Sequence, residues 1–237
     1  MSVLLAASDL DQTLVFSARS AGCDVADLVC VEVHEGRPLS HVTAPAARLL
    51  RLLTTAQLLV PATTRTPAQY GRIRLPGPPP RYAVCANGGV LLVDGVPDGG
   101  WTERVRAELA GCAPLADVRA ALDDLAAELV AAVPAGGVPG VHVVPGLFAY
   151  CVLRPGQREA LGAERVQELA ALLAGWGYGL SVQGRKVYAV PRGLTKSAGV
   201  AEVVRRTGAV GFVAAGDSLL DVDLLLAARA GVRPRHG

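Results

Sequence analysis

The feature that most constrains the fold is a strand–helix alternation that a block of different pattern interrupts. Short apolar segments typical of buried strands alternate with amphipathic helical segments up to residue 89, and the same alternation resumes at Thr195. Strands separated by helices are typical of a mostly parallel sheet. The sequence therefore predicts one α/β domain whose sheet is divided by a long insertion.

The predicted elements of the divided domain can be given by residue number. Before the insertion they are a strand at 3–7, a hairpin at 28–42 that turns at Glu35-Gly36, a helix at 46–56, a strand at 58–62, a short helix at 66–73 and a strand at 82–86. After it they are a helix at 197–206, a strand at 210–215 and a helix at 219–228. The sequence then runs to Gly237 without the further edge strand that such a sheet would be expected to have.

The inserted block has a pattern of its own. It contains helices at 101–110, 115–133 and 159–173, and apolar pairs at 141–153 and 180–190 that turn at Pro145-Gly146 and Gly184-Arg185. The order of helix, two strands, helix and two strands predicts a separate α+β module. We therefore expect a core formed by 1–89 and 191–237, and a second domain at 90–190, which begins with a hairpin after the turn Asn87-Gly88-Gly89.

Composition excludes several classes of protein. The 23 basic and 21 acidic residues leave a net charge of +2, which gives no electrostatic reason to expect nucleic acid or an anionic membrane as a partner. The longest uncharged stretch, Leu129 to Leu153, is too rich in proline and glycine for a spanning helix. Asp9 interrupts the first apolar segment, so we expect no signal peptide. Five scattered cysteines predict reduced, buried thiols, and together these features indicate a cytoplasmic protein.

Two pairs of acidic residues follow predicted strands. Asp9 and Asp11 come directly after the first strand, and Asp217 and Asp221 follow the strand at 210–215. Because the carboxyl ends of parallel strands meet at one edge of a sheet, we expect all four side chains to lie together. Clustered carboxylates require a compensating cation, and oxygen-only ligation favours Mg²⁺. The alternatives are a solvated loop with capping aspartates for the first pair and a helix first-turn position for Asp221.

Two further positions suit the binding of a phosphate group. The strand at 58–62 leads into Thr63-Thr64-Arg65, which offers a hydroxyl group and backbone N–H groups at a predicted helix N-terminus. Lys196 opens the helix that follows the insertion, and it is one of only two lysines among the 23 basic residues. This usage indicates that a compact ammonium group is needed there, although an ordinary solvated lysine is the alternative.

These residues, in this order, resemble the haloacid dehalogenase (HAD) superfamily of phosphohydrolases. Asp9-Leu10-Asp11-Gln12-Thr13 is similar to its first motif, DxDx[TV], and Gly216 to Asp221 is similar to its fourth, GDxxxD. Thr63 and Lys196 match the second and third motifs. The resemblance covers the whole chain. The αββαββ insertion and the turn at Asn87 are similar to the branch with a C2-type cap, which includes Cof-type and sucrose-phosphate-phosphatase-like proteins.

The resemblance implies a Rossmann-like core with a parallel sheet and a C2-type cap, and a Mg²⁺-dependent phosphatase that acts on a small phosphorylated metabolite such as a sugar phosphate. Asp9 would be the nucleophile and Asp11 the general acid and base, with Thr63 and Lys196 on the phosphate oxygens. Asp9, Asp11 through its backbone carbonyl, Asp217 and Asp221 would hold the metal ion. Further substrate contacts are expected from the core and from the cap hairpins: Thr64, Arg65, Asn87, Arg154, Arg185, Lys186 and Tyr188.

Three departures from the family pattern are visible. Gln12 stands where glycine is usual, Leu220 stands where asparagine is common, and the C-terminal part is shorter than usual. A non-catalytic interaction protein on the same scaffold therefore stays open. A phosphotransferase or phosphomutase also stays open, because it would use the same intermediate on Asp9. The cap residues have an alternative as solvated hairpin positions. The sequence does not indicate an oligomeric state.

Overall fold

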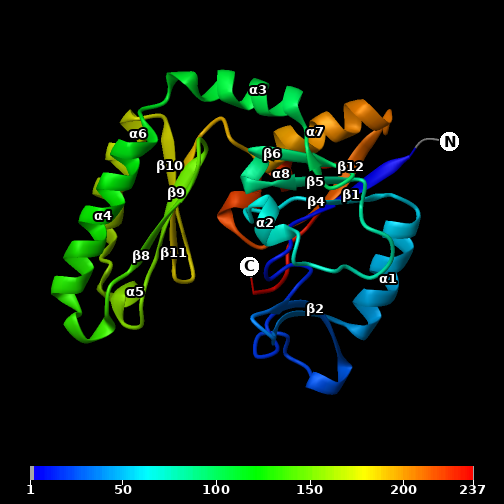
Figure 1. Ribbon diagram of the computed structural model, residues 1–237, viewed down its shortest axis with the longest axis horizontal. Coiled ribbons are helices and arrows are strands. Elements are labelled where there is room, and N and C mark those ends of the chain that lie inside the picture. Colours follow the sequence, from blue (N-terminus) through cyan, green and yellow to red (C-terminus); the bar gives the residue numbers. More distant parts are fainter. Residues whose placement is uncertain (1–2, 237) are drawn as a thin grey trace. The chain divides into compact units, whose positions relative to one another are not determined.

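The computed structural model describes residues 3–236 and divides the chain into two compact units (Figure 1). The first unit comprises the chain up to Glu103 and from Thr195 onward, and the second comprises Arg104–Leu194. The hairpin that follows Asn87 and the first residues of the next helix therefore belong to the first unit. Within residues 3–236, none of the helices combines the length and the apolar character that a membrane crossing requires.

A parallel sheet forms the centre of the first unit. Its strands are β1 (Leu4–Ser8), β4 (Leu59–Pro61), β12 (Gly211–Ala215) and β13 (Gly231–Val232), in the spatial order β13-β12-β1-β4. Ser8 at the end of β1 lies opposite both Ala215 of β12 and Pro61 of β4, so these three strands end at the same edge. The predicted parallel sheet is confirmed, and β13 supplies the edge strand whose absence was expected from the sequence.

Two antiparallel elements complete the strands of this unit. The predicted hairpin is formed by β2 (Leu28–His34) and β3 (Arg37–Thr43), and Glu35 and Gly36 make its turn with positive φ. A second sheet contains β5 (Tyr82–Cys85), β6 (Val90–Val93) and β7 (Val96–Pro97). A single parallel bridge between Ala62 and Val84 connects the end of β4 to β5.

The helices of the first unit pack against these strands. α1 (Ala44–Thr55) begins where the Thr43 side chain accepts a hydrogen bond from the Ala46 N–H, and it packs against β3 and β4. α7 (Lys196–Thr207) and α8 (Val222–Ala227) pack against each other and against β12. The remaining helices and 3-10 segments of this unit are α2 (Pro67–Tyr70), α3 (Gly99–Glu108, which runs on into the second unit), η1 (Val25–Asp27), η2 (Ala86–Gly88) and η5 (Leu219–Asp221).

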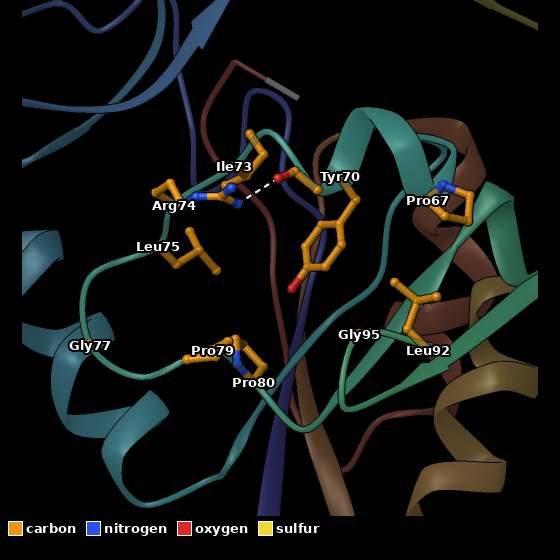
Figure 2. Close-up of a pocket in the computed structure, with 11 residues that line it drawn as sticks. Pro67, Tyr70, Ile73, Arg74, Leu75, Gly77, Pro79, Pro80, Leu92 and Gly95 are labelled. Carbon is orange, nitrogen blue, oxygen red and sulfur yellow. Dashed lines mark hydrogen bonds between the residues drawn. The ribbon is translucent and has the colours of Figure 1, made fainter. Parts of the chain in front are cut away.

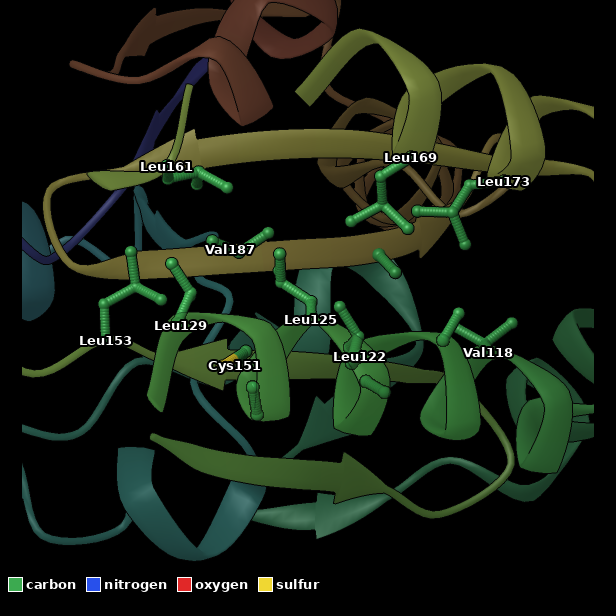
Figure 3. Packing of buried hydrophobic residues seen from close by; sticks show 14 of the residues in the cluster. Val118, Leu122, Leu125, Leu129, Cys151, Leu153, Leu161, Leu169, Leu173 and Val187 are labelled. Carbon is green, nitrogen blue, oxygen red and sulfur yellow. The ribbon is translucent and has the colours of Figure 1, made fainter. Parts of the chain in front are cut away.

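The second unit is the α+β module that the sequence predicts. Its elements are η3 (Leu109–Gly111), α4 (Leu115–Ala132), η4 (Pro134–Gly136), β8 (Gly140–Val144), β9 (Phe148–Val152), α5 (Gln157–Ala160), α6 (Ala163–Gly175), β10 (Tyr178–Gln183) and β11 (Lys186–Pro191). The antiparallel sheet has the strand order β10-β11-β9-β8. Leu122, Leu125 and Leu129 of α4 and Leu169 and Leu173 of α6 are buried in one apolar core with residues of β9 and β11 (Figure 3).

Three predictions of local structure are wrong. The helix expected at 159–173 is two helices, because Leu161 turns into the core and extended Gly162 starts α6. The helix expected at 219–228 begins as the 3-10 segment η5 and becomes α-helical only at Val222. All five cysteines are free, but Cys23 and Cys30 are exposed instead of buried.

Gly88 offers a direct test of how the turn after β5 is held. Its φ is +99°, and a Cβ atom there would lie 2.1 Å from the backbone oxygen of Thr195. We expect Gly88→Ala to lower the free energy of unfolding by about 2 kcal/mol or more, because backbone strain and a backbone clash add together. Gly95→Ala is the control, since Gly95 has φ +81° but open space around it. Equal losses in urea unfolding for both variants would contradict a role for the close approach.

Candidate active site

The loop after β1 lies at the edge where the parallel strands end. The Asp9 N–H donates to the carbonyl of Ala215 at the end of β12 (2.9 Å), and the Ala62 N–H donates to the carbonyl of Ser8 (2.8 Å). These hydrogen bonds extend the pairing of the sheet beyond the last strand residues. The segments that carry the predicted functional residues of the first unit therefore start side by side.

Lys196 is buried between two carboxylates. Its Nζ atom lies 2.6 Å from Oδ1 of Asp9 and 2.5 Å from Oδ1 of Asp221, and the three side chains are at most 7% exposed. Burial alone would lower the pKa of Lys196, but the charges of Asp9 and Asp221 raise it, so the ammonium group is charged. Thr195 caps α7, because its side chain accepts a hydrogen bond from the Ala198 N–H, and this cap fixes Lys196 as the first residue of the helix.

The ionised form of Asp9 is less favourable than that of a solvated carboxylate. Burial raises the pKa of Asp9, the charge of Lys196 lowers it, and the charge of Asp221 raises it again, so that on balance its pKa is raised to about 7. A buried carboxylate of this kind gains from any additional cation that approaches it. The ionised form of Asp9 thus depends on nearby positive charge.

Asp221 is held from both sides. One of its oxygens accepts from Lys196, and the other accepts from the backbone N–H and the hydroxyl group of Ser218, at 3.0 and 2.6 Å. Gly216 makes this arrangement sterically possible, since a Cβ atom there would lie 2.4 Å from Cβ of Asp221. The glycine of the GDxxxD pattern therefore has a packing reason in this chain.

Asp217 completes a cluster of three carboxylates. Oxygen atoms of Asp9, Asp217 and Asp221 all lie within 4.8 Å of one another. Burial, and then the charge of Asp221, raise the pKa of Asp217, although Thr13 donates a hydrogen bond to it over 3.3 Å. Together with Lys196, the fully ionised cluster carries a net charge of −2. An all-oxygen donor set with this charge fits a hard divalent cation such as Mg²⁺.

Asp11 forms a bidentate ion pair with Arg65. The Nε atom of Arg65 lies 2.8 Å from Oδ2 of Asp11, and its Nη2 atom lies 2.7 Å from Oδ1. Gln12 takes a φ of +62°, so the turn keeps the left-handed conformation that glycine favours, and the backbone N–H of Gln12 donates to the carbonyl of Val15. The His236 ring also hydrogen-bonds to the Gln12 carbonyl at 2.7 Å.

The segment after β4 holds Thr63 fully buried. Its hydroxyl group accepts from the Arg65 N–H at 3.1 Å, and its carbonyl accepts from the N–H of Asn87 at 2.9 Å. Asn87 is 3% exposed and adopts a positive φ of 55°. The short helix expected at 66–73 begins at Pro67 with Thr66 as its cap, but it already ends at Tyr70. Thr63 and Thr64 therefore lie in the loop that precedes this helix.

Arg185 and Tyr188 lie in the second unit. Arg185 is exposed at the turn between β10 and β11. Tyr188 is 5% exposed and belongs to an aromatic row across the sheet, in which the Tyr150 ring stacks on His142 at 5.0 Å and lies 5.4 Å from Tyr188. This row occupies the face opposite to α4 and α6, because its residues alternate with those of the buried core. Tyr188 therefore sits among rings that offer flat surfaces for stacking.

A buried carboxylate that shares Arg65 with Asp11 is not predicted from the sequence. Glu32 of β2 accepts from Arg65, Arg72 and Ser40, and its side chain is fully buried. The only signal in the sequence is that a charged residue interrupts an otherwise apolar strand, between Val31 and Val33.

A separate cavity of about 360 Å³ lies in the first unit beside α2 (Figure 2). Its walls are largely apolar and include Ile73, Leu75, Pro79 and Pro80, and the Tyr70 ring points into it. This lining does not suit a phosphate group. The segment that forms one wall also supports the hairpin, since the Arg74 N–H donates to the carbonyl of Val31 at 2.7 Å.

Comparison with known proteins identifies the fold as that of the HAD superfamily phosphatases, which confirms the fold expected from the motifs. No protein-family model matches the sequence, and no curated protein sequence matches it.

Three solved structures illustrate the likeness. The sucrose-phosphatase from Synechocystis sp. PCC6803, in complex with sucrose and phosphate, is 17% identical, with a TM-score of 0.58 over 100% of this chain and 84% of that one. The C-terminal domain of the C. albicans trehalose-6-phosphate phosphatase is 15% identical, with a TM-score of 0.59 over 95% and 73%. A haloacid dehalogenase-like hydrolase from Bacteroides thetaiotaomicron is 13% identical, with a TM-score of 0.57 over 99% and 89%.

Proposed function

We propose that this protein is a Mg²⁺-dependent phosphohydrolase that cleaves a small phosphomonoester through an aspartyl-phosphate on Asp9. The observation that carries the proposal is the cluster of Asp9, Asp217 and Asp221 around the buried ammonium group of Lys196. A purely structural role explains this cluster poorly, because a buried excess of negative charge destabilises a fold. The same cluster is well suited to bind a metal ion and a phosphate group.

The residues divide the reaction between them. Asp9 attacks phosphorus in line, so that an Oδ–P bond forms while the bond from phosphorus to the leaving oxygen breaks. Asp11 gives its proton to that leaving oxygen. In the second step, the water oxygen attacks phosphorus while Asp11 takes a proton from the water. The bond between Asp9 Oδ and phosphorus then breaks, which leaves the free Asp9 carboxylate and inorganic phosphate.

The other residues of the site would bind the phosphate group and the metal ion. Lys196 and Thr63 are suited to bind the equatorial phosphate oxygens, whose charge must be stabilised in the transition state. Asp9, Asp217, Asp221 and the backbone carbonyl of Asp11 would hold Mg²⁺. When bound, the ion would supply positive charge to the phosphate oxygens and to Asp9.

For the substrate we propose a phosphorylated sugar or a similar small metabolite. Names among the structural neighbours point to this class, since they include a sucrose-phosphatase, a trehalose-6-phosphate phosphatase and a trehalose-6-phosphate phosphatase related protein. The second unit would act as the cap, and Arg185 and Tyr188 are its proposed substrate contacts. Thr64, Arg65 and Asn87 are the proposed contacts of the first unit, although Arg65 already binds two carboxylates and would act mainly through Asp11. We propose the cytoplasm as its location.

Removal of divalent cations is expected to stop the reaction. Phosphate release from a panel of sugar, nucleotide and acid phosphates should fall to background with EDTA, a loss of at least about 100-fold, and should return with added Mg²⁺. Mg²⁺ alone should also raise the melting temperature, because a ligand that binds only the folded state stabilises it. Phosphate release that persists in EDTA would contradict the metal assignment. Phosphoryl transfer to an added sugar in excess of phosphate release would instead identify a phosphotransferase.

A further inference from the structure

Glu32 is a buried carboxylate that belongs to none of the sequence motifs. It lies in β2, and the pairing of β2 with β3 is shifted on both sides of it. Because of this irregularity, Glu32 and its neighbour Val31 are both buried, at 1% and 2% exposure, which regular strand alternation does not allow. The fold therefore directs this carboxylate inward at the cost of regular pairing.

Three donors satisfy Glu32. Its Oε2 atom accepts from the hydroxyl of Ser40 at 2.6 Å and from Nη1 of Arg65 at 2.9 Å, and its Oε1 atom accepts from Nε of Arg72 at 3.0 Å. Burial by itself would raise the pKa of Glu32, but these hydrogen bonds and the charge of Arg65 hold it below its ordinary value. Glu32 is thus a fixed anion inside the first unit.

Arg65 connects this anion to the candidate active site. Its Nη1 atom is taken by Glu32, while Nε and Nη2 bind the two oxygens of Asp11. The Arg65 side chain is only 12% exposed, so its guanidinium plane is enclosed between the two carboxylates. A guanidinium group is planar and its donors point in fixed directions. The position of Glu32 therefore determines the orientation in which Arg65 donates to the two oxygens of Asp11.

We propose that Glu32 is a positioning residue for the acid–base step, and that it acts by holding Arg65 in the orientation that fixes the Asp11 carboxylate. The proposal rests on the function proposed above, since Asp11 must transfer the proton. Without the anchor at Glu32, Arg65 can rotate, and Asp11 then spends less time in the one orientation that reaches the leaving oxygen or the attacking water.

Glu32→Gln is the first test, because the amide keeps the size of the side chain and removes its charge. We expect kcat for a sugar phosphate to fall by about 10- to 100-fold, as for other residues that orient a catalytic group, with little change in KM. Glu32 binds no substrate in this scheme, so a loss that appears mainly in KM would overturn the proposal.

A burst experiment separates positioning of Asp11 from general damage. The leaving group of p-nitrophenyl phosphate needs no proton, so the step that forms the aspartyl-phosphate should keep its rate in Glu32→Gln. Attack by water still needs Asp11 as a base, so the steady-state rate should fall and a burst of p-nitrophenolate should appear. Equal losses in the burst phase and the steady state would overturn the proposal.

Glu202→Gln is the matched control. Glu202 is also buried, at 6% exposure, and also lies between two arginines, Arg205 and Arg206, in the first unit. It should keep the wild-type kcat, and an equal loss in both variants would overturn the proposal.

Should Glu32→Gln fail to fold, Ser40→Ala removes one donor from the same carboxylate oxygen, and a smaller loss in kcat with a burst supports the proposal. A wild-type protein without phosphatase activity would refute the proposed function itself, which none of the variant results does.

Discussion

Asp9→Asn is expected to reduce phosphate release by at least about 1,000-fold, because the amide cannot act as the nucleophile. The fold should survive. Asparagine has nearly the same shape, and burial, which is the largest cause of the raised pKa of Asp9 (about 7), disfavours the charge that the substitution removes. Phosphate release and the melting temperature measured on the same samples give the two readouts.

Asp98→Asn serves as the control for Asp9→Asn. Asp98 belongs to the first unit and pairs with Arg206 through both of its oxygens, at 2.7 and 3.0 Å. It should lose some stability and keep its activity, the reverse of the pattern expected for Asp9. An Asp9→Asn protein with turnover close to the wild-type rate would remove Asp9 from the nucleophile position.

Lys196→Met should have the largest effect on stability. The variant leaves the buried carboxylates of Asp9 and Asp221 without their shared counter-charge, and breaking a buried pair in this way costs about 3–5 kcal/mol. Urea unfolding should show this loss, and added Mg²⁺ should recover part of it, because the ion supplies positive charge to the same carboxylates. Phosphate release should be lost as well.

Lys186→Met is the control because Lys186 is the other lysine of the chain. It is exposed, and its ammonium group lies 5.9 Å from the centre of the Tyr188 ring. Loss of this contact should cost no more than about 1 kcal/mol. Unfolding free energies that fall equally in the two lysine variants would show that the buried ammonium group does not stabilise the acidic cluster.

The position of the candidate site could be predicted from the sequence because its acidic residues follow the ends of predicted strands. Asp9 and Asp217 each follow an apolar strand, and neighbouring parallel strands bring such residues to one edge. The partners of each side chain could not be predicted in the same way. That Lys196 would bind Asp9 and Asp221 depends on how α7 packs against the sheet, which the helical pattern does not specify.

The network behind Asp11 could not be predicted for a local reason. Regular alternation places Val31 and Glu32 on opposite faces of β2, so one of them should be exposed. The irregular pairing of β2 with β3 buries both. Similarly, the break before α6 arises from the burial of Leu161, whereas the periodicity of 159–173 alone favours one continuous helix. In both places tertiary packing prevails over the local pattern.

The position of β1 between β4 and β12 has a consequence for synthesis of the chain. One edge of β1 finds its partner as soon as residues 59–61 emerge, but the other edge pairs with residues 211–215. Throughout translation of the intervening segment, the nascent protein carries an apolar strand with unsatisfied backbone groups along one side. Such an edge invites contacts with other chains, so completion of the sheet by residues 211–215 is the step most exposed to aggregation and to capture by chaperones.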